Sequence, residues 1–176
     1  MGRTALRLTH TAFLVALASA AAHPFTTSTS GSAKTVSLGA SGTAGAVAVG
    51  EADLRLYFGY DTLTDHSSWD AVLRSTRYYT ASYAALTRAV HPRPYDDPQW
   101  RTWAAHRAVM SVRVTRVYDA PPPPSTSTTT YAELEATVTP HGAHHWTGTT
   151  AVHFAWVAFT RARPGRPWLI SHMEVQ

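Results

Sequence analysis

The feature of this sequence that most constrains its fold is the order of its hydrophobic patterns. Helical periodicity comes first and strand-like alternation comes last. From Ala44 to about His106, apolar side chains recur at helical spacing. From Ala108 to the C-terminus, four runs alternate with a period of two. Helices followed by strands are typical of α+β domains, in which the helices pack on one side of an antiparallel sheet. The sequence therefore predicts N-terminal helices packed on a curved, four-stranded antiparallel sheet.

Two helices are expected first. Residues 44–60 place Val47, Leu54 and Phe58 on one face, and Gly45 and Gly50 weaken the start of this helix. Ser67 begins a variant capping box in which an aspartate replaces the usual glutamate, so a second helix is expected over 68–77. Its inward-facing side chains should be Trp69, Val72 and Leu73.

Two shorter helices should follow. A helix over 81–90 would bury Tyr83, Leu86 and Val90, and the prolines of 91–94 end it. Asp97 and Pro98 then read as an N-cap followed by proline at the first helical position. The one or two turns that they open carry Trp100 and Trp103.

Four strands are predicted, over 108–118, 128–139, 146–161 and 168–175, with a proline-rich hairpin loop at 119–127. The third is the longest run. Its Phe154 and Trp156 share a face with Val152, and the other face carries His153, Val157 and Phe159. We therefore expect this strand to be the centre of stability, with Trp156→Ala costing ~3–5 kcal/mol.

The N-terminal segment has the features of an export signal. Arg3 and Arg7 precede a short apolar run, and small residues at 18–22 suit cleavage. Residues 1–22 are therefore expected to be a cleaved signal peptide, with a short membrane anchor or a buried helix as alternatives. Residues 23–43 are rich in Ser, Thr and Gly, which predicts a flexible linker. The folded domain should then span 44–176.

Composition excludes several classes of function. The chain has no cysteine, so disulfides, thiolate catalysis and cysteine zinc sites are excluded. Its formal net charge is +4, but two of the positive charges are Arg3 and Arg7. The rest of the chain has no Lys/Arg cluster of the kind that binds nucleic acid, so no nucleic-acid partner is expected.

Two short segments resemble a known superfamily. Residues 57–62 (YFGYDT) and 77–83 (RYYTASY), with 164–170 (PGRPWLI) before the last strand, are similar to anchored actinobacterial proteins of the NTF2-like superfamily. The helix-then-meander layout resembles its cystatin-like cone fold. The nearest groups are conjugation components of VirB8/TcpC type and Mce-associated proteins. The resemblance implies a non-enzymatic scaffold outside the membrane, with protein partners and no catalytic residues to transfer.

Two clusters are candidates for chemistry. His141, His144 and His145 lie in one turn, but their spacing matches no standard metal site and the turn holds no acid. We therefore expect a solvated turn, with no metal and no cofactor. Asp61 belongs to a second cluster, with Asp65 and His66. An Asp/His pair inside a cone could transfer a proton, but Asp61 follows a helix end and is expected to cap the next turn.

The predicted sheet supplies two further candidates. His153 and His172 lie on adjacent strands and could be cross-strand neighbours, forming a polar spot with Glu174. Four aromatic residues could line one sheet face, as core filling or as an apolar ligand pocket: Tyr131, Trp146, Trp156 and Trp168.

The leading interpretation is an exported, non-catalytic accessory module of an envelope apparatus for conjugation or transport, with a homo-oligomer as an open alternative. Two other functions stay open. One is a small isomerase or dehydratase that uses His153, His172 or Asp61. The other is a carrier that holds a small apolar ligand in the cone.

Overall fold

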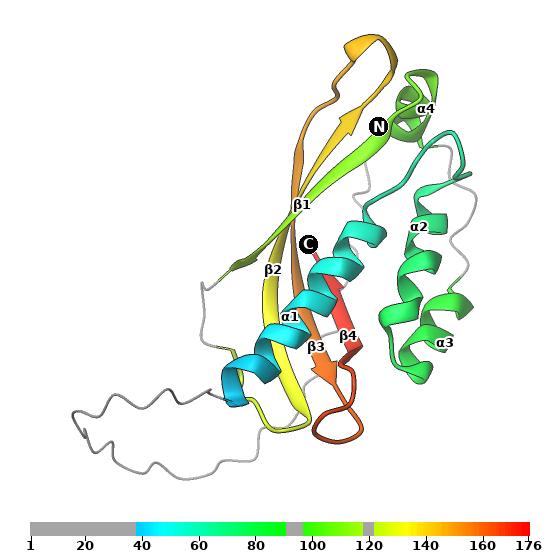
Figure 1. Cartoon of the computed structure of the whole chain (residues 1–176). Coiled ribbons are helices and arrows are strands. Elements are labelled where there is room, and N and C mark those ends of the chain that lie inside the picture. Colours follow the sequence, from blue (N-terminus) through cyan, green and yellow to red (C-terminus); the bar gives the residue numbers. More distant parts are fainter. Residues whose placement is uncertain (1–37, 91–96, 118–121) are drawn as a thin grey trace, which may run out of the picture. The chain divides into compact units, whose positions relative to one another are not determined.

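The structure is a computed structural model, and it describes residues 38–90, 97–117 and 122–176. In these ranges, helices precede a sheet whose strand order is β1-β2-β3-β4, with every neighbouring pair antiparallel (Figure 1). The predicted α+β class, with N-terminal helices on a four-stranded antiparallel meander, is confirmed. The predicted signal segment, 1–22, lies outside the described residues. None of the described helices is long and apolar enough to cross a membrane.

The strands agree with the alternation in the sequence. They are β1 (Val109–Val117), β2 (Thr129–His141), β3 (Ala151–Thr160) and β4 (Leu169–Val175). One prediction was wrong: β2, with 13 residues, is longer than β3, with 10. The third strand begins at Ala151 rather than at 146, because after the 3-10 turn η2 (Ala143–His145) Thr147 makes only an isolated bridge with His141 before the continuous ladder starts.

Helix α1 (Leu38–Tyr57) begins before Ala44, so the last residues of the predicted linker are helical. Of the two glycines that weaken this helix, Gly50 has a packing role. A Cβ atom on Gly50 would lie 2.7 Å from a side-chain carbon of Leu134 and 2.8 Å from one of Phe159. Glycine at this position therefore allows α1 to approach the sheet closely, and this outweighs its poor helix propensity.

Helices α2 and α4 begin where their capping residues predicted, and α3 begins at the predicted position. Helix α2 (Ser68–Ser75) follows the N-cap Ser67, and Asp70 Oδ2 accepts hydrogen bonds from the backbone N–H of His66 at 2.7 Å and of Ser67 at 3.3 Å. Helix α3 (Ala81–Ala89) follows the short 3-10 turn η1 (Thr76–Tyr78). Helix α4 (Pro98–Ala105) is capped by Asp97, whose Oδ1 accepts from the N–H of Gln99 at 2.8 Å.

The core lies between α1 and one face of the sheet. Its largest fully buried apolar side chains are Leu54, Leu134, Val157, Phe159 and Ile170. The expected burial of Leu73, Leu86 and Val90 was wrong, since all three side chains are exposed. Small residues, Ala71 in α2 and Ala84 in α3, are buried in these helices instead.

The faces of β3 also differ from the expectation. Val157 and Phe159 face the core, whereas Phe154 is exposed and Trp156 only half-buried on the opposite face. Trp156 is not part of the packed core cluster. The predicted large cost of Trp156→Ala therefore rested on the wrong face of the strand.

Candidate functional site

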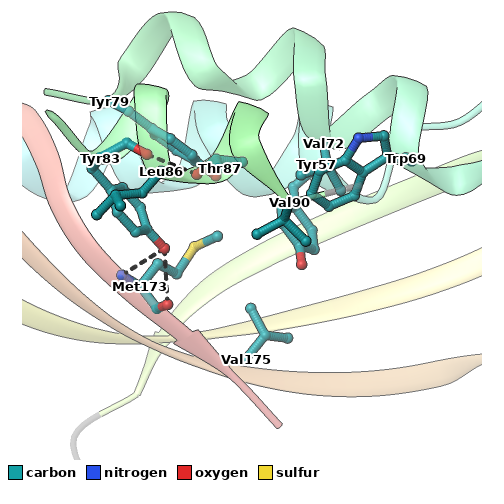
Figure 2. Close-up of a pocket in the computed structure, with 10 residues that line it drawn as sticks. All are labelled: Tyr57, Trp69, Val72, Tyr79, Tyr83, Leu86, Thr87, Val90, Met173 and Val175. Atoms are coloured by element: carbon teal, nitrogen blue, oxygen red, sulfur yellow. Dashed lines mark hydrogen bonds between the residues drawn. The ribbon is translucent and has the colours of Figure 1, made fainter. Parts of the chain in front are cut away.

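A cavity of about 380 Å³ opens between α2, α3 and β4, and we call it the α3 groove (Figure 2). Its lining is mainly aromatic and aliphatic. The residues that line it are Tyr57, Trp69, Val72, Tyr79, Tyr83, Leu86, Thr87, Val90, Met173 and Val175. Pockets that take small molecules or peptide side chains have this character and a similar volume.

The wall of the groove is held by hydrogen bonds to the outer edge of β4. The Tyr83 hydroxyl donates to the carbonyl of Met173 at 3.0 Å and accepts from the N–H of the same residue at 3.2 Å, as Figure 2 shows. The N–H of Thr80 donates to the carbonyl of Ile170 at 2.8 Å. These contacts occupy edge groups that would otherwise be open to strand addition, and they fix α3 beside the sheet.

The rim of the groove is apolar and open to solvent. Leu86 is 67% exposed and Val90 is 55% exposed, and both belong to the groove lining. The lining contains no carboxylate, imidazole or basic side chain, so its polar side-chain groups are hydroxyls and one indole N–H. Such a surface binds apolar groups and has no acid–base pair for proton transfer.

Asp53 is a buried acid that sequence reasoning missed. Its side chain has no solvent exposure, and neither carboxyl oxygen has a well-formed hydrogen bond in the described structure. Burial raises the pKa of Asp53 to about 8, and the nearby Ser75 hydroxyl offsets part of that rise. Little in the sequence indicated this burial, because Asp53 lies off the predicted apolar face of α1, which carries Leu54, and shares a face with Tyr57, one turn later.

Tyrosines of the groove wall surround this carboxyl. Burial, together with the charge of Asp53, raises the pKa values of Tyr57, Tyr79 and Tyr83. The Tyr79 hydroxyl lies 3.0 Å from Ser75 Oγ, which donates to the carbonyl of Val72 at 2.9 Å. All these groups stay neutral near pH 7, so the layer between the groove and α1 is polar but uncharged.

Asp61 takes the capping role expected of it. Its Oδ1 accepts from the N–H of Leu63 at 2.9 Å, and its own N–H donates to Asp65 Oδ2 at 2.9 Å. Asp65 is buried and paired with Arg74, whose hydrogen bonds hold the pKa of that carboxyl below its usual value. His66 points into solvent, so the cluster is a structural loop anchor.

The expected pairing of His153 with His172 was wrong. His172 lies opposite Ala158, while His153 lies past the end of β4 and opposite Ala136 of β2. The two histidines also face opposite sides of the sheet, because Ala158 and His153 differ by an odd number of positions. His153 stacks on Phe58 of α1, with ring centroids 4.5 Å apart.

The histidine turn is open to solvent. His141, His144 and His145 are exposed, and His144 and His145 adopt positive φ angles of 57° and 61°. Within the described ranges, no group of three or more His, Asp or Glu side chains has an arrangement that could hold a metal ion. The absence of a metal site at this turn stays a prediction.

The four aromatics proposed to line one face do not lie together. Trp146 stacks on His106 with ring centroids 4.1 Å apart, and Trp168 is buried beneath the guanidinium of Arg161 at 4.2 Å. Tyr131 and Trp156 lie on the sheet face away from α1. The aromatics that do form a pocket are those of the α3 groove.

No protein-family model and no curated protein matches this sequence. Two solved structures are similar to it in arrangement. One is a TrwG component of a type IV secretion system from Bartonella birtlesii, with 12% identity, a TM-score of 0.42 and coverage of 71% of this chain and 85% of that one. The other is an IcmL-like type IV secretion system protein from Legionella pneumophila, with 12% identity, a TM-score of 0.43 and coverage of 74% and 88%.

Proposed function

We propose that this protein is an exported, non-catalytic accessory module of an envelope apparatus for conjugation or transport, and that it binds a protein partner through the α3 groove. The observation that carries the proposal is the exposed apolar rim of that groove, at Leu86 and Val90. Large apolar side chains gathered around a concave surface mark interaction sites, because burying them on binding is favourable.

The placement of the catalytic candidates supports a binding role over an enzymatic one. Asp61 caps a turn, and His153 and His172 lie on opposite faces of the sheet. Asp53 is buried near the groove wall, but the groove lining provides no basic partner for it. General acid–base catalysis needs such groups within hydrogen-bond reach of one substrate position.

The proposed type of apparatus and the proposed location of the protein are both inferred from the sequence. The type of apparatus is inferred from the NTF2-like resemblance of residues 57–62 and 77–83, and the observed helix-then-meander order agrees with that resemblance. Export is inferred from Arg3, Arg7 and the apolar run that follows them.

Leu86→Asp in the full-length chain tests the docking surface. A charge at this exposed position should leave folding intact and abolish complementation of a deletion strain, since a buried unpaired carboxylate opposes binding. The matched control is Leu63→Asp, because Leu63 is 64% exposed but lies in the loop before α2, outside the groove lining. Circular dichroism and thermal unfolding check that both variants fold.

Full complementation by a folded Leu86→Asp protein would overturn the groove as the partner site. Equal failure of Leu63→Asp would also do so, since the effect would then come from added charge anywhere on the surface.

A carrier function is the second candidate, because the volume and apolar lining of the same groove also suit a small ligand. Titration with the apolar fluorophore N-phenyl-1-naphthylamine separates the two functions. A carrier should bind it at one site per chain and lose it in Leu86→Asp but not in Leu63→Asp. A docking groove that takes only a protein partner should show no saturable binding.

A further inference from the structure

The second face of the sheet carries a surface that the α3 groove does not explain. The described helices pack on the face of the sheet that holds Leu134, Val157 and Phe159 (Figure 1). On the opposite face Val152 is 51% exposed, Phe154 is also exposed and Trp156 is half-buried. None of these three side chains belongs to the core cluster.

The strand register places carboxylates around these aromatics. Trp156 lies between Glu133 of β2 and Glu174 of β4, in one row across three strands. In the next row Glu135 lies opposite Phe154. Directly opposed residues in an antiparallel sheet have Cβ atoms about 5 Å apart, so each aromatic ring has a carboxylate beside it. We call these five residues the aromatic–acidic face.

Among the described residues, no ion pair or cap uses these glutamates, whereas most of the other carboxylates outside the buried Asp53 are used in this way. Glu51 pairs with Arg55, Asp65 pairs with Arg74, and aspartates 61, 70 and 97 accept backbone hydrogen bonds. Within the described residues, Glu133 Oε2 is buried without a hydrogen-bond partner, and Glu135 receives one long hydrogen bond, 3.4 Å, from Thr137.

In the part of the chain that the structure describes, Trp156 also has no cation partner of the kind that Trp168 has. Trp168 carries the guanidinium of Arg161 at 4.2 Å from its ring centroid. Among the described side chains, no ring or cation packs on Trp156 in this way. A cation over an indole face is attracted by the ring, and flanking carboxylates strengthen the attraction through charge-assisted hydrogen bonds.

We infer that the aromatic–acidic face binds a basic, extended segment of a partner protein, with an arginine or lysine side chain seated on Trp156 between Glu133 and Glu174. Charge complementarity selects this occupant. The strand positions on this face hold three glutamates and one arginine, Arg113, whereas the whole chain is basic, with a net charge of +4. A basic segment should therefore find its binding site here rather than elsewhere on the surface.

The test is a fluorescence anisotropy titration of full-length protein with a fluorescein-labelled peptide of four Arg-Thr repeats. The matched probe has four Gln-Thr repeats. The arginine peptide should bind and the glutamine peptide should not, and binding should weaken as salt rises because the contacts are ionic. Glu174→Gln should weaken binding by about tenfold, the change that corresponds to 1.4 kcal/mol.

Two variants make the test specific. Glu51→Gln removes the same charge away from this face and should leave binding unchanged. Trp156→Leu keeps an apolar side chain on the strand but removes the ring, and it should weaken binding about as much as Glu174→Gln. Thermal unfolding checks that each variant folds.

Four results would overturn the inference. They are no saturable binding of the arginine peptide, equal losses in Glu51→Gln and Glu174→Gln, unchanged binding in folded Trp156→Leu, and a dimer in sedimentation that Glu174→Gln dissociates. The last would make a second copy of this chain the occupant. Failure here leaves the α3 groove untouched, because the groove test uses a different face and different variants.

Discussion

Asp53 shows how one residue links the groove to the stability of the fold. A carboxyl at zero exposure stays protonated near neutral pH, because ionising it without hydrogen bonds or a cation is costly. It lies one helical turn before Tyr57 of the groove wall, so its protonation state acts on the same layer that supports the groove.

Asp53→Asn should change how stability depends on pH. In the unfolded chain Asp53 ionises near its ordinary pKa of 3.8, whereas in the fold it stays protonated to about pH 8. The contribution of Asp53 to the free energy of unfolding is therefore fully present below pH ~4, declines as pH rises, and is lost by pH ~8. Urea unfolding at pH 5, 6.5 and 8 should show the stability of Asp53→Asn rising steadily relative to that of the unmodified protein.

Glu51→Gln is the control, since that side chain is solvent-facing and paired with Arg55. Parallel stability curves for Asp53→Asn and the unmodified protein would show that the carboxyl reaches water and that its pKa is ordinary.

Single residues also show which structural features could be predicted from the sequence. Capping by Ser67, Asp70 and Asp97 was predictable because each signal acts within one turn of the chain. The burial of Asp53 was not, since it depends on α2 and η1 bringing Ser75 and Tyr79 over it.

At the scale of elements, the two faces of β3 have different surroundings: one packs in the core and the other faces away from it. Val157 and Phe159 pack beneath α1, while Val152, Phe154 and Trp156 face away from the core. Alternation in the sequence located both sets. Because both sets are apolar, it did not indicate which set the helices would cover.

Phe159→Ala should therefore cost ~3–5 kcal/mol of unfolding free energy, the range for large buried aromatics. Trp156→Ala should cost less than ~2 kcal/mol, as expected for a half-exposed position. Denaturant unfolding of both variants measures the difference. The opposite order would mean that the outer face of β3, and not the α1-facing side, is the packed one.

In helix α3, too, the periodicity of the sequence did not indicate which side chains would be buried. Helical spacing grouped Tyr83, Leu86 and Val90 on one face, but the helix contacts β4 through the Tyr83 hydroxyl, and its buried side chain is that of Ala84. Leu86 and Val90 consequently line the groove rim instead of the core.

At the scale of the whole molecule, the described helices cover one face of the sheet, and the aromatic–acidic face lies on the other. A domain with two such surfaces suits a module that joins partners. In the two proposals, the α3 groove accepts an apolar group and the second face accepts a basic one. Their positions on opposite sides of the sheet allow both to be occupied at once.

The proposed export depends on the N-terminal segment and is tested with that segment. Fusing residues 1–43 to a reporter that is active only outside the cytoplasmic membrane should give reporter activity, because Arg3, Arg7 and the apolar run have the features of an export signal. Replacing Leu14 and Leu17 by Asp should abolish the activity by breaking the apolar run. A fusion that stays in the cytoplasm would contradict the proposed location.

The sequence alone determined the order of the elements, the positions of the caps and the alternation of the strands, because these depend on neighbours along the chain. The tertiary structure decided the rest. The β-bulge between Ala158 and Phe159 and the register of β4 separate His153 from His172. The close approach of α1 at Gly50 selects the buried face of the sheet. Both depend on contacts between segments far apart in sequence, which local periodicity does not encode.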